Sequence, residues 1–125
     1  MSLHYEVVIF TASLSKYAEP LLRKMDPLGK WCSYILFREH CTYLNSEEAY
    51  VKDLSIIGRD LKNVIIVDNS PTSYSFHPQN ALASRSWYDD DDDHELYDFI
   101  PLLKALTKVD DVRPVLVQIS VEACY

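Results

Sequence analysis

The stretch VIIVDNSP, residues 64–71, carries the clearest structural signal in this sequence of 125 residues. Its first four residues are all β-branched, which is typical of a strand buried on both faces of a parallel sheet. The polar residues from Asp68 to Ser70 and the following Pro71 then end the strand. Ligands of open parallel sheets bind at the carboxyl ends of the strands, so Asp68 and Asn69 occupy positions where a site is expected.

Similar signals precede this stretch. The runs EVVIF, residues 6–10, and YILF, residues 34–37, each predict a buried strand, and residues 49–51 predict a shorter one. The residues between the second and third of these strands form a loop or a hairpin. Apolar residues at helical spacing between residues 14 and 25 predict a short helical turn followed by a longer helix, with Pro20 in the first turn of the second piece.

The remainder of the chain continues the alternation of strands and helices. Residues 81–83 predict a brief strand, Trp87 follows, and the acidic run at residues 89–93 precedes a helix over residues 94–106. Strands that alternate with helices indicate an α/β fold with a parallel sheet flanked by helices. In such a fold Thr11, Lys52 and Asp68-Asn69 all fall at the carboxyl ends of strands.

The net charge, the cysteine spacing and the lengths of the apolar runs exclude some classes of binding partner and location. A net charge of -7 and a pI near 4.9 disfavour direct binding of nucleic acid or of an anionic membrane. The cysteines, which are Cys32, Cys41 and Cys124, have neither CxxC spacing nor clustered histidines, so reduced thiols in a nuclear or cytoplasmic protein are expected. No apolar run approaches the ~20 residues that span a bilayer, so no membrane segment is expected in this chain.

Three strand ends together suggest phosphoryl transfer. Taken singly, Thr11 is most simply a helix cap, Lys52 a solvated side chain, and Asp68-Asn69 a turn. In combination they provide a hydroxyl donor, a compact cation and oxygen ligands. Phosphoryl transfer requires such groups, since the protein mainly positions the phosphoryl group and neutralises its charge.

Five segments of the sequence then resemble successive motifs of one family. They are FTAS at residues 10–13, FREHC at 37–41, YVKDL at 50–54, GRDL at 58–61 and VDNSP at 67–71, with SWY at 86–88 and VDDV at 109–112 extending the pattern. The chain resembles the small C-terminal-domain phosphatases, which are NLI-interacting-factor-like members of the haloacid dehalogenase superfamily, and the Dullard phosphatases are similar. The resemblance covers about residues 5–116 and implies a haloacid-dehalogenase-like, Rossmann-like parallel sheet.

The resemblance also implies catalytic and metal-binding roles. Thr11 would hold a transferring phosphoryl oxygen, and Lys52 would neutralise its charge and fix the nucleophile. Asn69 would ligate Mg²⁺ with Asp68 beside it, and oxygen ligands suit that ion. Arg38 is a candidate for a second phosphate contact.

A further assignment from the resemblance concerns a pocket that recognises the substrate. Leu14 and Tyr17 match positions that in the family line an apolar pocket for a proline near the phosphoserine. Both residues are equally good core residues on a helical face, so the sequence leaves the two interpretations open.

The signature that carries the nucleophile in this family, Asp-x-Asp-x-Thr, does not occur in the sequence. Residues 89–93 have no threonine at the required offset, and residues 68–72 have serine in place of the second aspartate. The expectation is therefore that residues 1–125 are the C-terminal portion of a single phosphatase domain, incomplete at its N-terminus and inactive alone. The resemblance implies that the strand with the nucleophile lies in the centre of the sheet. Its neighbours in the sheet would be the strand of residues 6–10 on one side and the strand of residues 64–67 on the other.

Two functions remain at this stage. In the first, the protein is a Mg²⁺-dependent phosphoserine phosphatase that acts on the RNA polymerase II C-terminal domain or a similar phosphoprotein, and is membrane-associated if it is Dullard-like. In the second, it is a non-catalytic binding module, as mitochondrial import-receptor subunits of related fold are. The joint presence of Thr11, Lys52 and Asn69 favours the first, because a scaffold has no physical need for all three.

Overall fold

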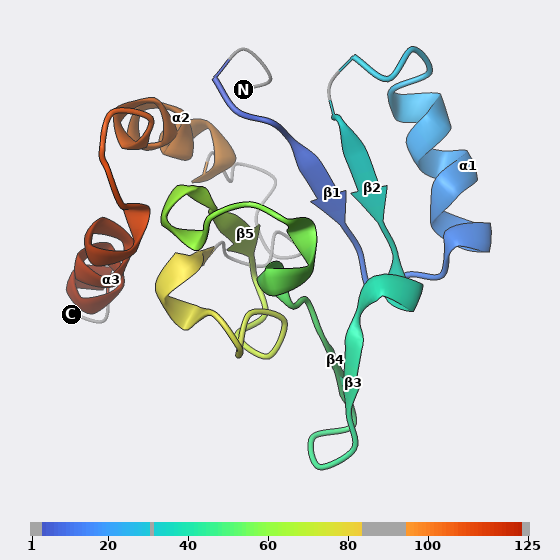
Figure 1. Cartoon of the computed structure of the whole chain (residues 1–125). Coiled ribbons are helices and arrows are strands. Elements are labelled where there is room, and N and C mark those ends of the chain that lie inside the picture. The colour runs from blue at the N-terminus through green and yellow to red at the C-terminus, as the bar shows by residue number, and fades with distance from the viewer. Residues whose placement is uncertain (1–3, 31, 84–94, 124–125) are drawn as a thin grey trace. The chain divides into compact units, whose positions relative to one another are not determined.

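The structure of the chain is a computed structural model, which describes residues 4–30, 32–83 and 95–123 (Figure 1). It divides into two compact units, Met1–Lys52 (unit 1) and Asp53–Tyr125 (unit 2), and each is described here by itself. Trp87, the acidic run at residues 89–93 and the predicted helix start at His94 lie outside the described residues.

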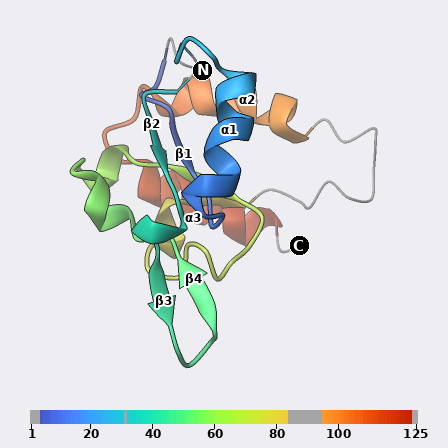
Figure 2. The ribbon, with the colours of Figure 1, turned by 90° about the vertical axis from the view of Figure 1, so that its right-hand side faces the viewer.

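Unit 1 begins with a strand, a helix and a second strand. These are β1 (Val8–Phe10), α1 (Ser15–Met25) and β2 (Tyr34–Leu36). The two strands are parallel, with Ile9 opposite Ile35, as the sequence predicts. Figure 2 shows α1 alongside this strand pair, and side chains from all three elements line a common pocket.

The helix α1 differs from the prediction, because it is one continuous helix and not a turn followed by a second helix. Pro20 lies inside it, so it removes one backbone N–H without ending the helix. Leu14 at the N-cap has no polar side chain to cap the first turn. The carboxylate of Glu39 accepts a hydrogen bond from the backbone N–H of Ser15 at 3.2 Å and supplies the missing cap from another segment.

A hairpin completes unit 1. A 3-10 turn at Arg38–His40 follows β2 and leads into the antiparallel strands β3 (Thr42–Leu44) and β4 (Ala49–Val51). This confirms the hairpin alternative for the segment before residue 49. Tyr43 and Tyr50 are opposite each other in the register, and their ring centroids are 5.1 Å apart.

Unit 2 contains a parallel strand pair and two long helices. In order, its elements are the 3-10 turns Leu54–Ile57 and Leu61–Asn63, β5 (Ile66–Asp68), the 3-10 turn Pro78–Asn80, β6 (Ala81–Ala83), α2 (Glu95–Leu106) and α3 (Val112–Ala123). Gly58 ends the first turn with a left-handed φ of 69°, which glycine adopts without steric cost. The strand predicted from residue 64 begins at Ile66, and β6 pairs with it in parallel.

The buried core lies mainly in unit 2. One cluster consists of Leu54, Val64, Ile66 and Ala81, and the other of Leu82, Leu106, Val112 and Leu116. The second cluster depends on α3, a helix that the sequence analysis did not predict. Its first turn is held by Asp111, whose carboxylate accepts hydrogen bonds from the backbone and guanidinium of Arg113, and this pairing lowers the pKa of Asp111 to about 2.

The sheet is less extensive than expected. The described strands form three separate two-stranded sheets, β1-β2, β3-β4 and β5-β6, and not one continuous sheet. The molecule is therefore a mixed α/β structure with two parallel strand pairs. Burial on both faces was also wrong for two strands, because β1 is only half-buried and Val67 in β5 is 40% exposed. A strand in a two-stranded sheet has fewer neighbours to cover it than a central strand has.

None of the helices in the described residues is long and apolar enough to cross a membrane.

Asn80 is the buried polar residue that organises unit 2. It is fully buried, and its side-chain amide donates hydrogen bonds to the carbonyls of Leu61 at 2.7 Å and Val64 at 2.8 Å. These bonds tie the turn before β6 to the segment that enters β5. Its side-chain oxygen Oδ1 has no hydrogen-bond partner in the described residues.

The substitution Asn80→Ala is expected to lower the stability of the chain by about 1–3 kcal/mol. It removes the side-chain donor of the Val64 carbonyl, and a buried unsatisfied group costs about 1–3 kcal/mol, whereas the Leu61 carbonyl still accepts from the backbone N–H of Val64 at 3.2 Å. Chemical denaturation followed by circular dichroism measures the change. Asn63→Ala, at an exposed position in a neighbouring turn, is the matched control and should change stability by less than about 0.5 kcal/mol. Equal effects of the two substitutions would contradict a structural role for Asn80.

Candidate functional site

Thr11 lies directly after β1, as the sequence predicts. Its backbone N–H donates to the carbonyl of Leu36 at 2.9 Å, which extends the ladder between β1 and β2 by one residue. Its hydroxyl Oγ1 accepts a hydrogen bond from the backbone N–H of Ser13 at 3.1 Å. The hydroxyl is thus fixed at the carboxyl end of the strand pair, and its own proton remains available for donation to a ligand.

Arg38 is brought to the same end of the strand pair. Its backbone N–H donates to the carbonyl of Ser13 at 2.9 Å, and its side-chain Nε–H donates to the carbonyl of Ala12 at 2.6 Å. Its guanidinium also lies over the ring of Tyr50, 4.9 Å from the ring centroid. The segment after β1 therefore carries Thr11 and positions Arg38.

Lys52 reaches this region through the hairpin. Thr42 and Val51 are partners in the register of β3 and β4, so Cys41 and Lys52 come one residue beyond that pair. Burial raises the pKa of the Cys41 thiol, while the positive charges of Lys52 and Arg38 act in the opposite direction. Both cations therefore act on the same half-buried thiol.

Thr11, Arg38 and Lys52 together form what we call the anion set. All three belong to unit 1 and are half-buried. In the described part of the chain Arg38 has no carboxylate partner, because the neighbouring Glu39 is engaged at the start of α1. The hydrogen bond from Ser15 holds the pKa of Glu39 below its usual range, so this carboxylate stays charged at the helix N-terminus.

The predicted metal ligands belong to unit 2. Asp68 is the last residue of β5, and its Oδ1 accepts a hydrogen bond from the backbone N–H of Ser70 at 2.9 Å. Asn69 follows in the turn and is exposed. Among the described residues no group of three or more His, Cys, Asp or Glu side chains forms a metal site. The oxygen donors of Asp68 and Asn69 fit Mg²⁺, which commonly takes one or two carboxylates and completes its shell with water and phosphate oxygens.

The residues assigned to a proline pocket lie at the start of α1. Leu14 is half-buried, whereas Tyr17 is 67% exposed. The ammonium of Lys16 lies 5.0 Å from the centroid of the Tyr17 ring. The exposure of Tyr17 favours a surface position over a core position for this residue, and its role in substrate binding remains a prediction.

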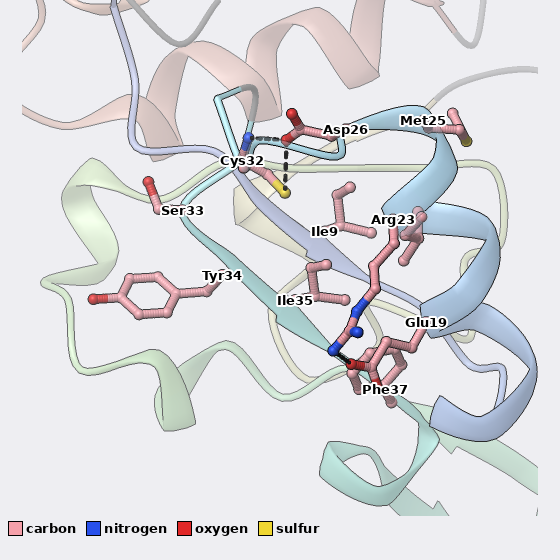
Figure 3. A pocket seen from close by; sticks show the side chains of 12 residues that line it. Ile9, Glu19, Arg23, Met25, Asp26, Cys32, Ser33, Tyr34, Ile35 and Phe37 are labelled. Atoms are coloured by element: carbon pink, nitrogen blue, oxygen red, sulfur yellow. Dashed lines mark hydrogen bonds and ion pairs between the residues drawn. The ribbon is translucent and has the colours of Figure 1, made fainter.

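A different pocket, of about 520 Å³, lies between α1 and the strand pair (Figure 3). Its apolar wall includes Ile9 and Ile35, and Cys32 lies at one end, where its backbone N–H and thiol both contact Asp26. None of the predicted site residues lines it. Burial and the Asp26 carboxylate raise the pKa of Cys32, which makes this thiol a weak nucleophile.

One contact within unit 2 was missed by the sequence analysis. His77 Nε2 lies 3.0 Å from Oδ1 of Asp53, and the same carboxylate oxygen accepts the backbone N–H of Ser55. The hydrogen bond with His77 is the largest cause of the lowered pKa of Asp53. The pair links two 3-10 turns of unit 2, and the separation of these residues in sequence gave no local signal for it.

Tyr50 was also absent from the predicted set, although it contacts Arg38. The signal that could have indicated this role was the predicted hairpin, because pairing of β3 with β4 places the aromatic residues at positions 43 and 50 on one face. The sequence did not fix the register, so this contact required the structure.

Comparison with known proteins shows the family to which the chain belongs. The family described as NLI interacting factor-like phosphatase matches residues 1–113, and the chain belongs to this family. The chain is 59% identical over 112 residues to a probable C-terminal domain small phosphatase of Dictyostelium discoideum, which covers 90% of the chain and 36% of that protein. It is 53% identical over 114 residues to phosphatase Herzog of Drosophila melanogaster, covering 90% of the chain and 31% of that protein.

A human relative is similar to the same extent. The chain is 51% identical over 116 residues to the carboxy-terminal domain RNA polymerase II polypeptide A small phosphatase 1, covering 91% of the chain and 42% of that protein. The chain thus spans between about three tenths and about two fifths of the length of these three relatives.

Proposed function

We propose that this chain provides the phosphate-binding and metal-binding residues of a Mg²⁺-dependent protein serine phosphatase. The observation that carries the proposal is the anion set in unit 1, in which a fixed hydroxyl and two cations come together in a member of a phosphatase family. Phosphoryl transfer is catalysed mainly by such positioning and charge neutralisation.

Each residue of the anion set has a distinct role in the proposal. The hydroxyl of Thr11 donates a hydrogen bond to a phosphoryl oxygen. Lys52 offsets the negative charge that spreads over these oxygens in the transition state and orients the attacking carboxylate. Arg38 provides a planar donor group for a second oxygen.

Asp68 and Asn69 would hold Mg²⁺ through oxygen atoms. When bound, this ion neutralises phosphoryl charge and orients the group for attack. Asp68 keeps its carboxylate oriented by the hydrogen bond to Ser70, so one of the proposed ligands is already fixed by its turn.

The attacking group in this proposal is the first aspartate of Asp-x-Asp-x-Thr. That motif does not occur among the 125 residues of the sequence, so in the proposed reaction a strand outside this sequence provides it. Its carboxylate attacks phosphorus and forms an aspartyl-phosphate, while the bond from phosphorus to the seryl oxygen breaks and that oxygen takes a proton from the second aspartate. Water then hydrolyses the aspartyl-phosphate, which releases inorganic phosphate and restores the carboxylate.

The proposed substrates are phosphoserine-containing proteins. The name of the human relative associates that protein with the RNA polymerase II C-terminal domain, and this domain or a similar phosphoprotein is the substrate that we propose for the present chain. With this substrate, the proposed location of the protein is the nucleus or the cytoplasm. If the protein instead has a Dullard-like function, the proposed location is at a membrane.

The second candidate is a non-catalytic module that binds phosphoproteins. The absence of Asp-x-Asp-x-Thr from the sequence is the observation that favours it. A fusion of this chain to a strand that carries Asp-x-Asp-x-Thr distinguishes the two functions. Mg²⁺-dependent release of phosphate from a phosphoserine peptide is expected for a phosphatase. A folded fusion that binds the peptide and releases no phosphate would favour the binding module.

In the same fusion, Asn69→Ala is expected to raise the Mg²⁺ concentration that gives half-maximal activity by about 10-fold or more. The substitution deletes one of a small number of protein ligands. A Mg²⁺ titration of peptide hydrolysis measures the effect. Asn63→Ala, an asparagine in an exposed turn of the same unit, is the matched control. An unchanged Mg²⁺ dependence would leave Asp68-Asn69 as a structural turn.

A further inference from the structure

The orientation of Arg38 depends on more than its backbone. Two hydrogen bonds fix its main chain and its Nε–H against residues 12 and 13. A single hydrogen bond from Nε–H leaves the whole planar guanidinium able to turn about the axis of that bond, and no carboxylate in the described residues pairs with its terminal nitrogens. The ring of Tyr50, whose centroid is 4.9 Å from Cζ, is a further contact that restricts this rotation.

Tyr50 is itself held in place by its hairpin. Tyr43 lies directly opposite in the register, and the two rings form a tilted pair with an interplanar angle of 53°. Tyr43 and Tyr50 are 48% and 36% exposed, so both rings are partly open to solvent while they contact each other. The buried Val51 follows Tyr50 and ends β4, and Lys52 of the anion set comes directly after the strand.

We infer that Tyr50 is a positioning residue, which stacks on Arg38 and holds its guanidinium in the plane required to bind a phosphoryl group beside Thr11. Tyr43 supports Tyr50 in this role. The inference rests on the proposed function of the anion set and adds a residue to it. The recognised chemistry is a tetrahedral oxyanion, such as phosphate or a phosphoserine.

Aromaticity, and not size or the hydroxyl, is the property of Tyr50 that matters. A phenylalanine at this position keeps the π face on which a guanidinium stacks, whereas a leucine keeps apolar volume and loses that face. Lysine in place of Arg38 keeps the charge and loses the planar group. These substitutions separate stacking from charge and from packing.

The experiment measures binding of O-phosphoserine to the full 125-residue chain by NMR titration. Tyr50→Leu is expected to weaken binding by about 2- to 5-fold, as loss of an exposed cation–π contact predicts, and Tyr50→Phe to leave it unchanged. The Nε–H signal of Arg38, sharp in the parent chain, should broaden in Tyr50→Leu. In an Arg38→Lys background, Tyr50→Leu should have a smaller effect, because the planar stack is already lost.

Tyr34→Leu is the matched control, since Tyr34 is an exposed strand tyrosine of the same unit. Its binding should equal that of the parent chain. The inference is overturned if the parent chain does not bind, if Tyr50→Leu acts equally in both backgrounds, or if it changes neither binding nor the Arg38 signal. Hydrolysis by the fusion tests the proposed function separately, so an active fusion in which Tyr50 has no effect would refute the inference alone.

Discussion

A polypeptide of these 125 residues is expected to show no hydrolysis of p-nitrophenyl phosphate in the presence of Mg²⁺. In the proposed function the anion set binds and orients a phosphoryl group, but the 125 residues contain no Asp-x-Asp-x-Thr sequence whose carboxylate could attack it. Loss of a nucleophile generally lowers kcat by a factor on the order of 10⁴ or more, even when the remaining site is intact. The assay compares the chain with its fusion to a strand that carries the motif.

The control for this experiment is a fusion in which the first aspartate of the motif is changed to asparagine. It should be as inactive as the chain alone while it retains the same circular dichroism spectrum. Turnover by the 125-residue chain that is abolished by EDTA and recurs in independent preparations would contradict the prediction, since another group would then act as the nucleophile.

The second large effect is expected for Lys52→Met in the active fusion, with kcat lowered by a factor on the order of 10² or more. Methionine keeps much of the length of lysine and removes its charge, so the negative charge of the transition state loses a preorganised partner. The affinity for the substrate should change less than kcat, because this charge develops as the reaction proceeds. Steady-state kinetics with a phosphoserine peptide separates the two quantities.

Lys62→Met is the matched control, because Lys62 is an exposed lysine in a 3-10 turn of unit 2. It should leave kcat and KM unchanged. A fusion that keeps near-normal kcat after Lys52→Met, with an unaltered circular dichroism spectrum, would show that Lys52 is an ordinary surface lysine and that the anion set is wrongly assigned.

The strands that were predicted close to their observed positions are those that depend on local sequence composition. Short apolar runs predicted β1, β2 and β5 close to their observed positions, because each run has the length and composition of a strand. The polar residues that follow them ended the strands. This is why Thr11, Lys52 and Asp68 were placed correctly at strand ends before any tertiary information was used.

The elements that were missed or misjudged have tertiary causes. The helix α1 is continuous through Pro20, and its first turn is capped by Glu39, which lies beyond β2 in the sequence. The helix α3 packs its Val112 and Leu116 against Leu82 and Leu106. In both cases the helix depends on residues distant in sequence, which a reading of local periodicity does not include.

The sequence by itself indicated the family of this protein, the approximate positions of β1, β2 and β5, and the residue types that we propose for phosphate and metal binding. These depend on motifs and on local hydrophobic patterns, which are properties of short segments. Only the tertiary structure decided which of these residues act on one another. The contacts of Arg38 with Ala12 and Tyr50, and the joint effect of Arg38 and Lys52 on Cys41, require a specific pairing of β1 with β2 and of β3 with β4. Register sets those contacts, and register arises from the packing of whole strands.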